Sequence, residues 1–534
     1  MLDFASLKLT KIKENPSDNF VGIRKSALGD GYEFCLPNGF DDFPDGDFDA
    51  VRDFFFKMYR TFRKFERDNT GTSRLQQNKP QYQQDQDQTT LSAGGISMQT
   101  EDGEDCVLYS KIKMIERVLE AYDDLAINSI QKKVRRSEEI DYSQIHKYLD
   151  RAIYLDNDVI YIDAMDLPRP TVRYESTDIV NLYCYILDEI VQQLDGDVPD
   201  NIQARIQDIR FLAQHFQDDY LTSNQSIFDK DTFGETISIL KEALDNIDKN
   251  TYYKDADYWG LYEAIETFLY GEINPDQNDG DFWGIKGFSY VWEDMCNTYF
   301  FKEYLDNICY ADTDIPLKNY SNRERQGVNR VGNYKAYDGD NGYGNQWIYR
   351  TISDIPYHDK NTEKSRCLGW NELLCIEFDL KPATFVYSND KYSTLDQRDR
   401  IKAMRRFPRP DLVLKFKSES YEIWEVQILD YKNVNLDFYL NHQRLIFDQI
   451  DAKEEKYKKY KFDIIKSLTY EFALQQTPNV HVVDNVFFIP WYYDREPKPI
   501  FGETEANLDI QGKGIHVVKG NFFLLQKKYL EESL

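Results

Sequence analysis

The stretch from residue 405 to residue 432 constrains the fold more than any other part of the chain. It holds two β-rich apolar runs joined by a short polar tip near Ser418 and Glu419. Two such runs around a short tip are typical of a β-hairpin. With the turn centred on that tip, antiparallel pairing predicts that Asp411 lies roughly opposite residues 425–427.

The predicted hairpin gathers polar side chains in one patch. Glu425 and Gln427 share one face of the second strand because side chains alternate along a strand, whereas Val426 points the other way. Two carboxylates, those of Asp411 and Glu425, would then lie beside an amide. Mg²⁺ or Mn²⁺ prefers oxygen ligands of this kind, and such a cation assists phosphate hydrolysis. An exposed hairpin with polar ends fits the same pattern.

Length and composition exclude several classes of protein. A chain of 534 residues with 41% hydrophobic residues is too long for one ordinary core, so two or three domains are expected. No apolar run approaches about 18 residues, and the N-terminus lacks a signal-peptide core, so we expect a cytoplasmic protein without a membrane span. Seven cysteines without a CxxC pair and six histidines predict neither a zinc module nor a disulfide framework.

The charge of the chain limits how it can meet nucleic acid. A formal net charge of −28 argues against a protein that coats DNA indiscriminately, because phosphate neutralisation drives such binding. A local basic segment, 398–417, nevertheless contains Arg405, Arg406 and Arg409 directly before Asp411. We expect these arginines to contact the DNA backbone, and the alternative for such a segment is a solvated face.

The order of predicted elements indicates a multidomain chain of the α+β or α/β class. The expected regions are a β/α region at 1–69, a flexible Gln-rich insertion at 70–105, a mainly helical region at 106–280 and a last domain at 285–534. The expected helices are at 48–67, 107–131, 137–152, 176–195, 287–308 and 463–474. The expected strands, besides the hairpin and short strands within 1–40, are at 154–163, 373–380, 384–387 and 480–490.

Several separated segments follow the order of motifs in a known nuclease family. They are EIDY at 139–142 with Ile145, a strand pattern at 159–161, a helix pattern at 178–180, GFSYVWEDM at 287–295, PDLVL with IWEVQ in the hairpin, and DIIKSLTYEFAL at 463–474. Together they resemble the LlaJI-type restriction endonucleases, McrC-like members of the PD-(D/E)xK superfamily, over about three quarters of the chain.

The resemblance implies a Mg²⁺-dependent (or Mn²⁺-dependent) endonuclease domain at 285–534, a mixed sheet flanked by helices. It implies in-line attack by water on phosphodiesters of double-stranded DNA, as part of restriction or anti-phage defence. It also implies an McrB-like AAA+ GTPase as partner, with the helical region serving DNA recognition or partner docking.

The resemblance also suggests roles for individual residues. Asp411 and Glu425 are expected as metal ligands, with Glu293 as a third, and Lys466 is expected to contact the scissile phosphate. A helix-surface carboxylate is the alternative for Glu293, and a solvated helix residue is the alternative for Lys466.

One departure from the family pattern concerns the lysine of its motif. Gln427 stands in that place and would position water through a neutral amide, which stabilises developing charge less well. Lys466 or Lys432 could substitute, although Lys432 also fits a simple loop cation. The departure leaves open a second function, a catalytically impaired scaffold subunit of an antiviral complex.

Overall fold

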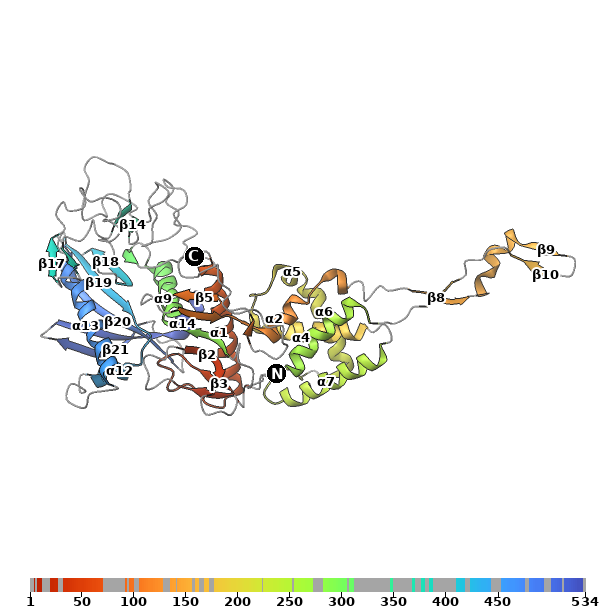
Figure 1. Cartoon of the computed structure of the whole chain (residues 1–534), viewed down its shortest axis with the longest axis horizontal. Helices are drawn as coiled ribbons and strands as arrows, with labels where there is room; N and C mark the ends of the chain where they lie inside the picture. Colours follow the sequence, from red (N-terminus) through yellow and green to blue (C-terminus); the bar gives the residue numbers. More distant parts are fainter. Residues whose placement is uncertain are drawn as a thin grey trace. The chain divides into compact units, whose positions relative to one another are not determined.

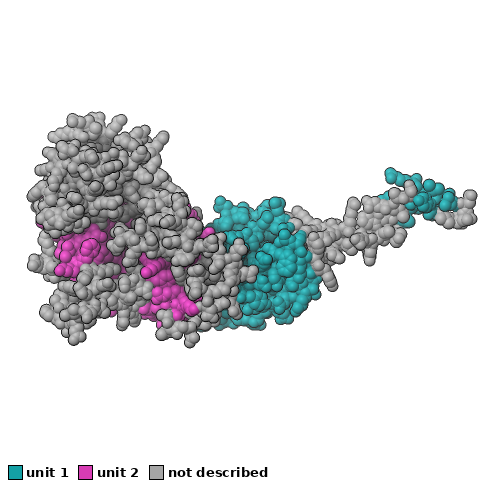
Figure 2. Space-filling view, in the orientation of Figure 1, with its two compact units in different colours: residues 1, 87–89, 113–273 teal, residues 2–86, 90–112, 274–534 magenta. Residues whose placement is uncertain are grey.

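The structure is a computed structural model of the whole chain. It describes residues 4, 7–11, 20–26, 32–70, 92–93, 96–99, 105–127, 135–140, 142–155, 159–162, 168–171, 177–222, 224–251, 254–271, 282–304, 307–311, 346–348, 367–369, 376–379, 384–387, 410–417, 423–442, 453–475, 480–493, 501–510 and 513–531. The chain divides into two compact units, a larger one of residues 2–86, 90–112 and 274–534 and a smaller one of residues 1, 87–89 and 113–273 (Figure 2). Helices and mixed sheets together confirm the α+β class.

The first sheet of the larger unit joins the start of the chain to a strand far along it. Its six strands, in spatial order, are β1 (Lys8–Thr10), β3 (Tyr32–Cys35), β2 (Phe20–Lys25), β12 (Phe282–Lys286), β6 (Asp105–Tyr109) and β5 (Ile96–Gln99). The β/α region at 1–69 therefore shares this sheet with β12 and belongs to the same unit as residues after 274. The strands at 96–99 and 105–109 also correct the expectation of a flexible insertion through residue 105.

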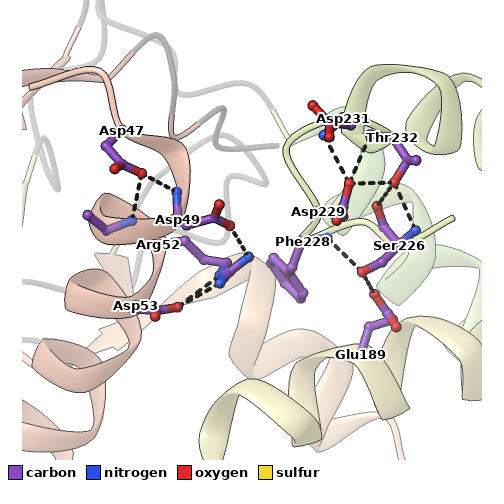
Figure 3. A network of polar contacts seen from close by, with 11 residues as sticks. Asp47, Asp49, Arg52, Asp53, Glu189, Ser226, Phe228, Asp229, Asp231 and Thr232 are labelled. Carbon is purple, nitrogen blue, oxygen red and sulfur yellow. Dashed lines mark hydrogen bonds and ion pairs between the residues drawn. The ribbon is translucent and has the colours of Figure 1, made fainter. Parts of the chain in front are cut away.

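Helix α1 (Phe48–Asn69) packs on this sheet and confirms the helix predicted at 48–67. Its N-terminus is capped by Asp47, whose carboxylate accepts from the backbone N–H groups of Asp49 at 3.1 Å and Ala50 at 3.2 Å (Figure 3). The buried face of α1 is largely aromatic and surrounds the fully buried ring of Trp283. Aromatic residues thus supply much of the apolar area buried here.

The second sheet of the larger unit carries the predicted hairpin. Its strands, in spatial order, are β13 (Ile308–Ala311), β18 (Leu412–Lys417), β19 (Trp424–Tyr431), β20 (Val480–Trp491), β22 (Lys513–Asn521) and β21 (Phe501–Ile510). The sheet is mixed, because β20 lies parallel to β19 and β22 whereas β18 and β21 pair antiparallel with their neighbours. The predicted strand at 480–490 is confirmed as β20.

Helices cover both faces of this second sheet (Figure 1). The helices are α9 (Ser289–Glu303), α12 (Leu436–His442), α13 (Lys453–Gln475) and α14 (Phe522–Leu530). Side chains alternate along β20, so Phe487 packs with α12 and α13 while Phe488 stacks on Trp292 of α9. Any side chain on β19 therefore faces either the α13 layer or the α9 layer.

Short ladders complete the larger unit. They pair β4 (Ser92–Ala93) with β7 (Lys111–Ile112), β14 (Gln346–Ile348) with β15 (Cys367–Gly369), and β16 (Ile376–Asp379) with β17 (Thr384–Tyr387). The last pair confirms the strands predicted at 373–380 and 384–387.

The smaller unit is built mainly of helices. They are α2 (Lys113–Glu120), the 3₁₀ helix η1 (Tyr142–Arg151), α4 (Thr177–Leu194), α5 (Asp200–Gln203), α6 (Ile206–Tyr220), α7 (Phe233–Asn250) and α8 (Ala256–Tyr270). Helix α4 packs against α2, α6, α7 and α8, and its apolar side chains are buried. The predicted helix at 176–195 is confirmed as α4.

Three predictions in the smaller unit need correction. The range 107–131 holds helix α2 only after two short strands, and 137–152 begins as strand β8 (Arg135–Ile140), paired with β11 (Pro168–Thr171), before η1. The single strand predicted at 154–163 is a hairpin of β9 (Ile153–Leu155) and β10 (Val159–Tyr161). The intervening Asp-Asn-Asp at 156–158 is a turn composition that divides the apolar pattern.

Two further observations concern the predicted class of protein. The cysteines at 35, 184 and 296, which lie within the described residues, are buried thiols. None of the helices within the described ranges combines the length and the apolar character that crossing a bilayer demands.

Candidate metal centre

The register of the hairpin decides which acidic residues meet. Leu412 of β18 pairs with Leu429 of β19, so Asp411, which directly precedes β18, lies opposite Asp430. The predicted turn centred near residue 418 is wrong, because the ladder closes only at the pairing of Lys417 with Trp424. A longer tip shifts the register and brings a different carboxylate to Asp411.

Glu425 lies near the other end of the hairpin. It pairs with Phe416, five residues along β19 from Asp430. At about 3.3 Å per residue this places the two backbones roughly 16 Å apart. The predicted pairing of Asp411 with Glu425 is therefore wrong, and these two carboxylates do not share a cation.

Gln427 also lies away from Asp411. Its Nε2 donates to Oδ2 of Asp484 on β20 at 3.0 Å, and Asp484 in turn contacts His516 Nδ1 at 2.7 Å. Because side chains alternate along β19, Gln427 and Asp430 point to opposite faces of the sheet. Gln427 is thus part of a polar contact on the other face and does not stand in for a lysine beside Asp411.

Asp411 and Asp430 form the carboxylate pair at the end of the hairpin. An Asp411 oxygen accepts from the backbone N–H of Tyr431, the residue after Asp430. Burial, followed by the charge of Asp430, raises the pKa of Asp411 well above its usual range. Burial acts against the ionised form of Asp430 as well, but Lys432 and Lys466 and a hydrogen bond with Asp411 leave its pKa below the ordinary value.

The opposite directions of these two pKa shifts follow from two buried carboxylates that lie side by side. Two adjacent carboxylates repel each other when both are ionised, so one of them retains its proton. A bound divalent cation would replace that proton and relieve the repulsion, which is the electrostatic behaviour of a cation site.

Lys432 lies beside the pair on the same face of the strand end, two residues after Asp430. Its Nζ is 2.8 Å from Asp430 Oδ2 and 3.2 Å from Asp463 Oδ1, and 5.5 Å from the centre of the Phe487 ring. Burial acts to lower the pKa of Lys432, but Asp430 and Asp463 raise it above the ordinary value. The side chain is therefore a fully charged ammonium. A simple loop cation, the alternative for Lys432, does not describe this buried ion pair.

Glu293 and Lys466 reach the same place from the two helix layers. Glu293 lies on α9 and Lys466 on α13. After burial and Asp430, Glu293 is the next influence that raises the pKa of Asp411, while Lys466 opposes it. The structure thus brings both predicted residues into electrostatic range of Asp411. The predicted DNA-binding arginines 405, 406 and 409 lie outside the described residues.

The donor set fits a hard divalent cation. Mg²⁺ keeps several waters and is commonly held by one or two carboxylates, which the pair of Asp411 and Asp430 supplies. Within the ranges that the structure describes, no group of three or more His, Cys, Asp and Glu side chains is arranged to hold a metal ion. The centre therefore offers two carboxylates, with Glu293 at longer range.

Asp430 is the carboxylate opposite Asp411 that the hairpin prediction missed. A signal for it was present, because residues 428–432 read ILDYK and place an acidic residue two positions before a lysine. The segment chosen instead, EVQ at 425–427, has the acidic residue without the lysine. In the sequence prediction, Lys432 has a role only as a substitute for Gln427. In the sequence Asp430-Tyr431-Lys432, however, the lysine belongs to the same short motif as Asp430.

Comparison with known proteins identifies no relative: no protein-family model, no curated protein and no solved structure matches the chain. A function for this centre therefore depends on its geometry and charge.

Proposed function

We propose that this chain is a Mg²⁺-dependent (or Mn²⁺-dependent) DNA endonuclease whose active site contains Asp411, Asp430 and Lys432. The observation that carries the proposal is the juxtaposition of Asp411 with Asp430 at a sheet end, with the Lys432 ammonium 2.8 Å from Asp430. With the register of the structure, the chain has Pro410-Asp411 directly before β18 and Asp430-Tyr431-Lys432 at the end of β19. That order is the PD-(D/E)xK pattern with its lysine in place.

The surrounding fold supports the same proposal. The hairpin belongs to a mixed sheet with α9 against one face and α13 against the other, as expected for a PD-(D/E)xK-type domain. Each helix also contributes a charged residue near Asp411, Glu293 from α9 and Lys466 from α13. The two layers and the sheet end thus converge on one small set of acidic and basic side chains.

Each residue of the proposed site has a separate role in hydrolysis. Asp411 and Asp430 would hold a divalent cation, which lowers the pKa of bound water and offsets phosphate charge when present. The Lys432 ammonium donates hydrogen bonds toward the developing negative charge on the attacked phosphate. Lys466 adds a second positive charge, and we propose that it contacts the scissile phosphate.

Lys432 also bears on the rival function. The interpretation as a catalytically impaired scaffold subunit arose from Gln427 at the position of the family's lysine. In the observed register Gln427 contacts Asp484 on the other face, and a buried lysine accompanies the carboxylate pair. The observation that favoured a scaffold role therefore no longer points to it.

An exposed apolar hairpin in the smaller unit supports a protein partner. Strands β9 and β10 expose Tyr154 at 67%, Ile153 and Leu155 at 54%, Tyr161 at 52% and Ile160 at 49%. Contiguous apolar side chains on a two-stranded ribbon are typical of an interaction site. The aspartates in the sequence between the strands disfavour contact with phosphates. We propose that the partner is a protein, in keeping with an AAA+ GTPase of the McrB kind.

Cleavage assays test the proposal directly. Wild type is incubated with double-stranded DNA or RNA and Mg²⁺ or Mn²⁺, with a chelator control and with or without the candidate GTPase partner. We expect metal-dependent cleavage of DNA that is lost in Asp411→Asn and Asp430→Asn. Wild type that cleaves neither polymer under any of these conditions removes the endonuclease proposal, and cleavage of RNA alone replaces the substrate.

A further inference from the structure

Lys432 is held by carboxylates on two sides. Its ammonium contacts Asp430 at 2.8 Å and Asp463 of α13 at 3.2 Å. All three side chains are nearly buried, with 13% of Lys432, 2% of Asp430 and 7% of Asp463 exposed. The ammonium therefore bridges one carboxylate of the proposed cation site and one carboxylate that lies outside the pair.

Asp463 is itself held in place by packing. Its Oδ2 accepts from the Tyr439 hydroxyl of α12 at 3.2 Å. Tyr439 is fully buried, and its ring stacks on Phe487 with a centroid distance of 4.9 Å and an interplanar angle of 30°. The Lys432 ammonium lies over the same Phe487 ring. Tyr439 thus orients Asp463, and the Phe487 ring on which Tyr439 stacks also contacts the Lys432 ammonium.

A bound cation would change what Asp430 can do for Lys432. Once the Asp430 oxygens face a divalent cation, they attract the ammonium less, and the cation repels it. A lysine held by Asp430 alone would then leave the site. We propose that Asp463, oriented by Tyr439, is a positioning residue that keeps the Lys432 ammonium beside the attacked phosphate while Asp430 holds the cation. This inference depends on the proposed function, because Lys432 acts only in that reaction.

Cleavage kinetics of the full chain on DNA test the role. Asp463→Asn preserves size and removes charge, and we expect it to lower kcat roughly 10- to 100-fold, as for other residues that orient a ligand or catalytic group. KM should change less than about threefold, because the ammonium acts mainly in the transition state. Tyr439→Phe should lower kcat less, roughly 3- to 10-fold, because only one hydrogen bond to Asp463 is lost.

Two comparisons separate positioning from structural damage. Glu471→Gln is the matched control, since Glu471 is a nearly buried carboxylate on the same helix that bonds to Asn485 and Gln475. We expect its kcat to stay within about twofold of wild type. In a Lys432→Met background, Asp463→Asn should cause no further loss of kcat, because Asp463 acts only through the lysine.

Mn²⁺ binding measured by calorimetry gives a readout that does not depend on cleavage. Without Asp463, the ammonium turns wholly to Asp430 and competes with the cation, so Asp463→Asn should weaken Mn²⁺ binding by roughly 3- to 10-fold. The same change in the Lys432→Met background should leave Mn²⁺ affinity unaltered.

Each contrary result overturns the inference. It is wrong if Asp463→Asn cleaves as fast as wild type, if its loss persists unchanged in the Lys432→Met background, or if Mn²⁺ affinity does not fall. Wild type without any cleavage removes the proposed function and the inference with it. Active wild type with equally active Asp463→Asn removes only the inference, so the two failures are distinguishable.

Discussion

The choice between Asp430 and Glu425 as partner of Asp411 gives a quantitative prediction. Glu425 lies five residues from Asp430 along β19, roughly 16 Å away at about 3.3 Å per residue. In water, the interaction energy of two unit charges at that distance is about 0.3 kcal/mol before salt screening. Glu425→Gln should therefore lower cleavage by less than about twofold.

Asp430 adjoins the proposed cation, so substitution of Asp430 should lower cleavage far more than substitution of Glu425. A carboxylate about 4 Å from a charge contributes about 4 kcal/mol at an effective dielectric constant of about 20. Asp430→Asn should then lower kcat/KM about 10³-fold. Asn has the same size, and Lys432 keeps its contact with Asp463, so the fold should survive the change.

The assay compares initial cleavage rates of both variants with wild type at one Mn²⁺ concentration, after circular dichroism and thermal unfolding have shown that each is folded. Equal losses in Glu425→Gln and Asp430→Asn would falsify the register argument, since only a shared cation site could couple the two. Full activity in Asp430→Asn would remove Asp430 from the active site.

Three further predictions concern stability. Mn²⁺ at about 100 times its Kd should add about 2.7 kcal/mol to the free energy of unfolding of wild type but little to that of Asp411→Asn. Urea unfolding with and without the cation measures this gain. An equal gain in the two proteins would show that the cation binds elsewhere. Burial raises the pKa of Glu189, which accepts from the Ser226 hydroxyl (Figure 3) and from the Ile227 N–H. The native state therefore binds this proton more tightly than the unfolded chain. Stability of wild type should therefore fall as pH rises from the ordinary value of 4.5 through the raised pKa, and Glu189→Gln should flatten this slope in denaturation measured across that interval; an unchanged slope contradicts the assignment. Gly39→Ala should cost about 1–3 kcal/mol in thermal unfolding, because φ is +79° and the added Cβ would lie 2.2 Å from the Pro490 carbonyl oxygen; a cost near zero shows that this contact yields.

Elements with strong local patterns could be predicted from the sequence. The helices expected at 48–67 and 176–195 correspond to α1 (Phe48–Asn69) and α4 (Thr177–Leu194). The buried strand expected at 480–490 corresponds to β20. In each case the hydrophobic period is repeated often enough within one segment to specify both the type of element and its approximate ends.

The register of the hairpin could not be predicted by the same means. A polar tip marks where a hairpin turns, but the number of residues in the tip decides which side chains face each other. The sequence prediction placed residues 425–427 opposite Asp411, whereas Asp430 lies farther along the same apolar run. The spacing of Asp430 and Lys432 is a signal for the correct position, but only the ladder that closes at Lys417 and Trp424 fixes the register.

Contacts between distant segments account for the remaining differences. β12 (residues 282–286) lies between β2 and β6, and the sequence of those five residues does not indicate which strands pair with it. The hairpin of β9 and β10 was predicted as one strand because its apolar pattern continues on both sides of a short acidic sequence. Pairing partners are a property of the folded chain, whereas periodicity is a property of one segment.

The position of Lys432 illustrates how far such contacts reach. The loop that follows it is tied to the turn at residues 38–39, because Asn38 Nδ2 donates to the backbone oxygen of Asn433 at 3.0 Å. Asn435 Nδ2 likewise donates to Asp41 at 3.1 Å. Residues nearly four hundred positions earlier therefore hold the backbone next to the proposed catalytic lysine. For this reason the N-terminal β/α region is part of the support of the site, although its sequence carries none of the proposed catalytic groups.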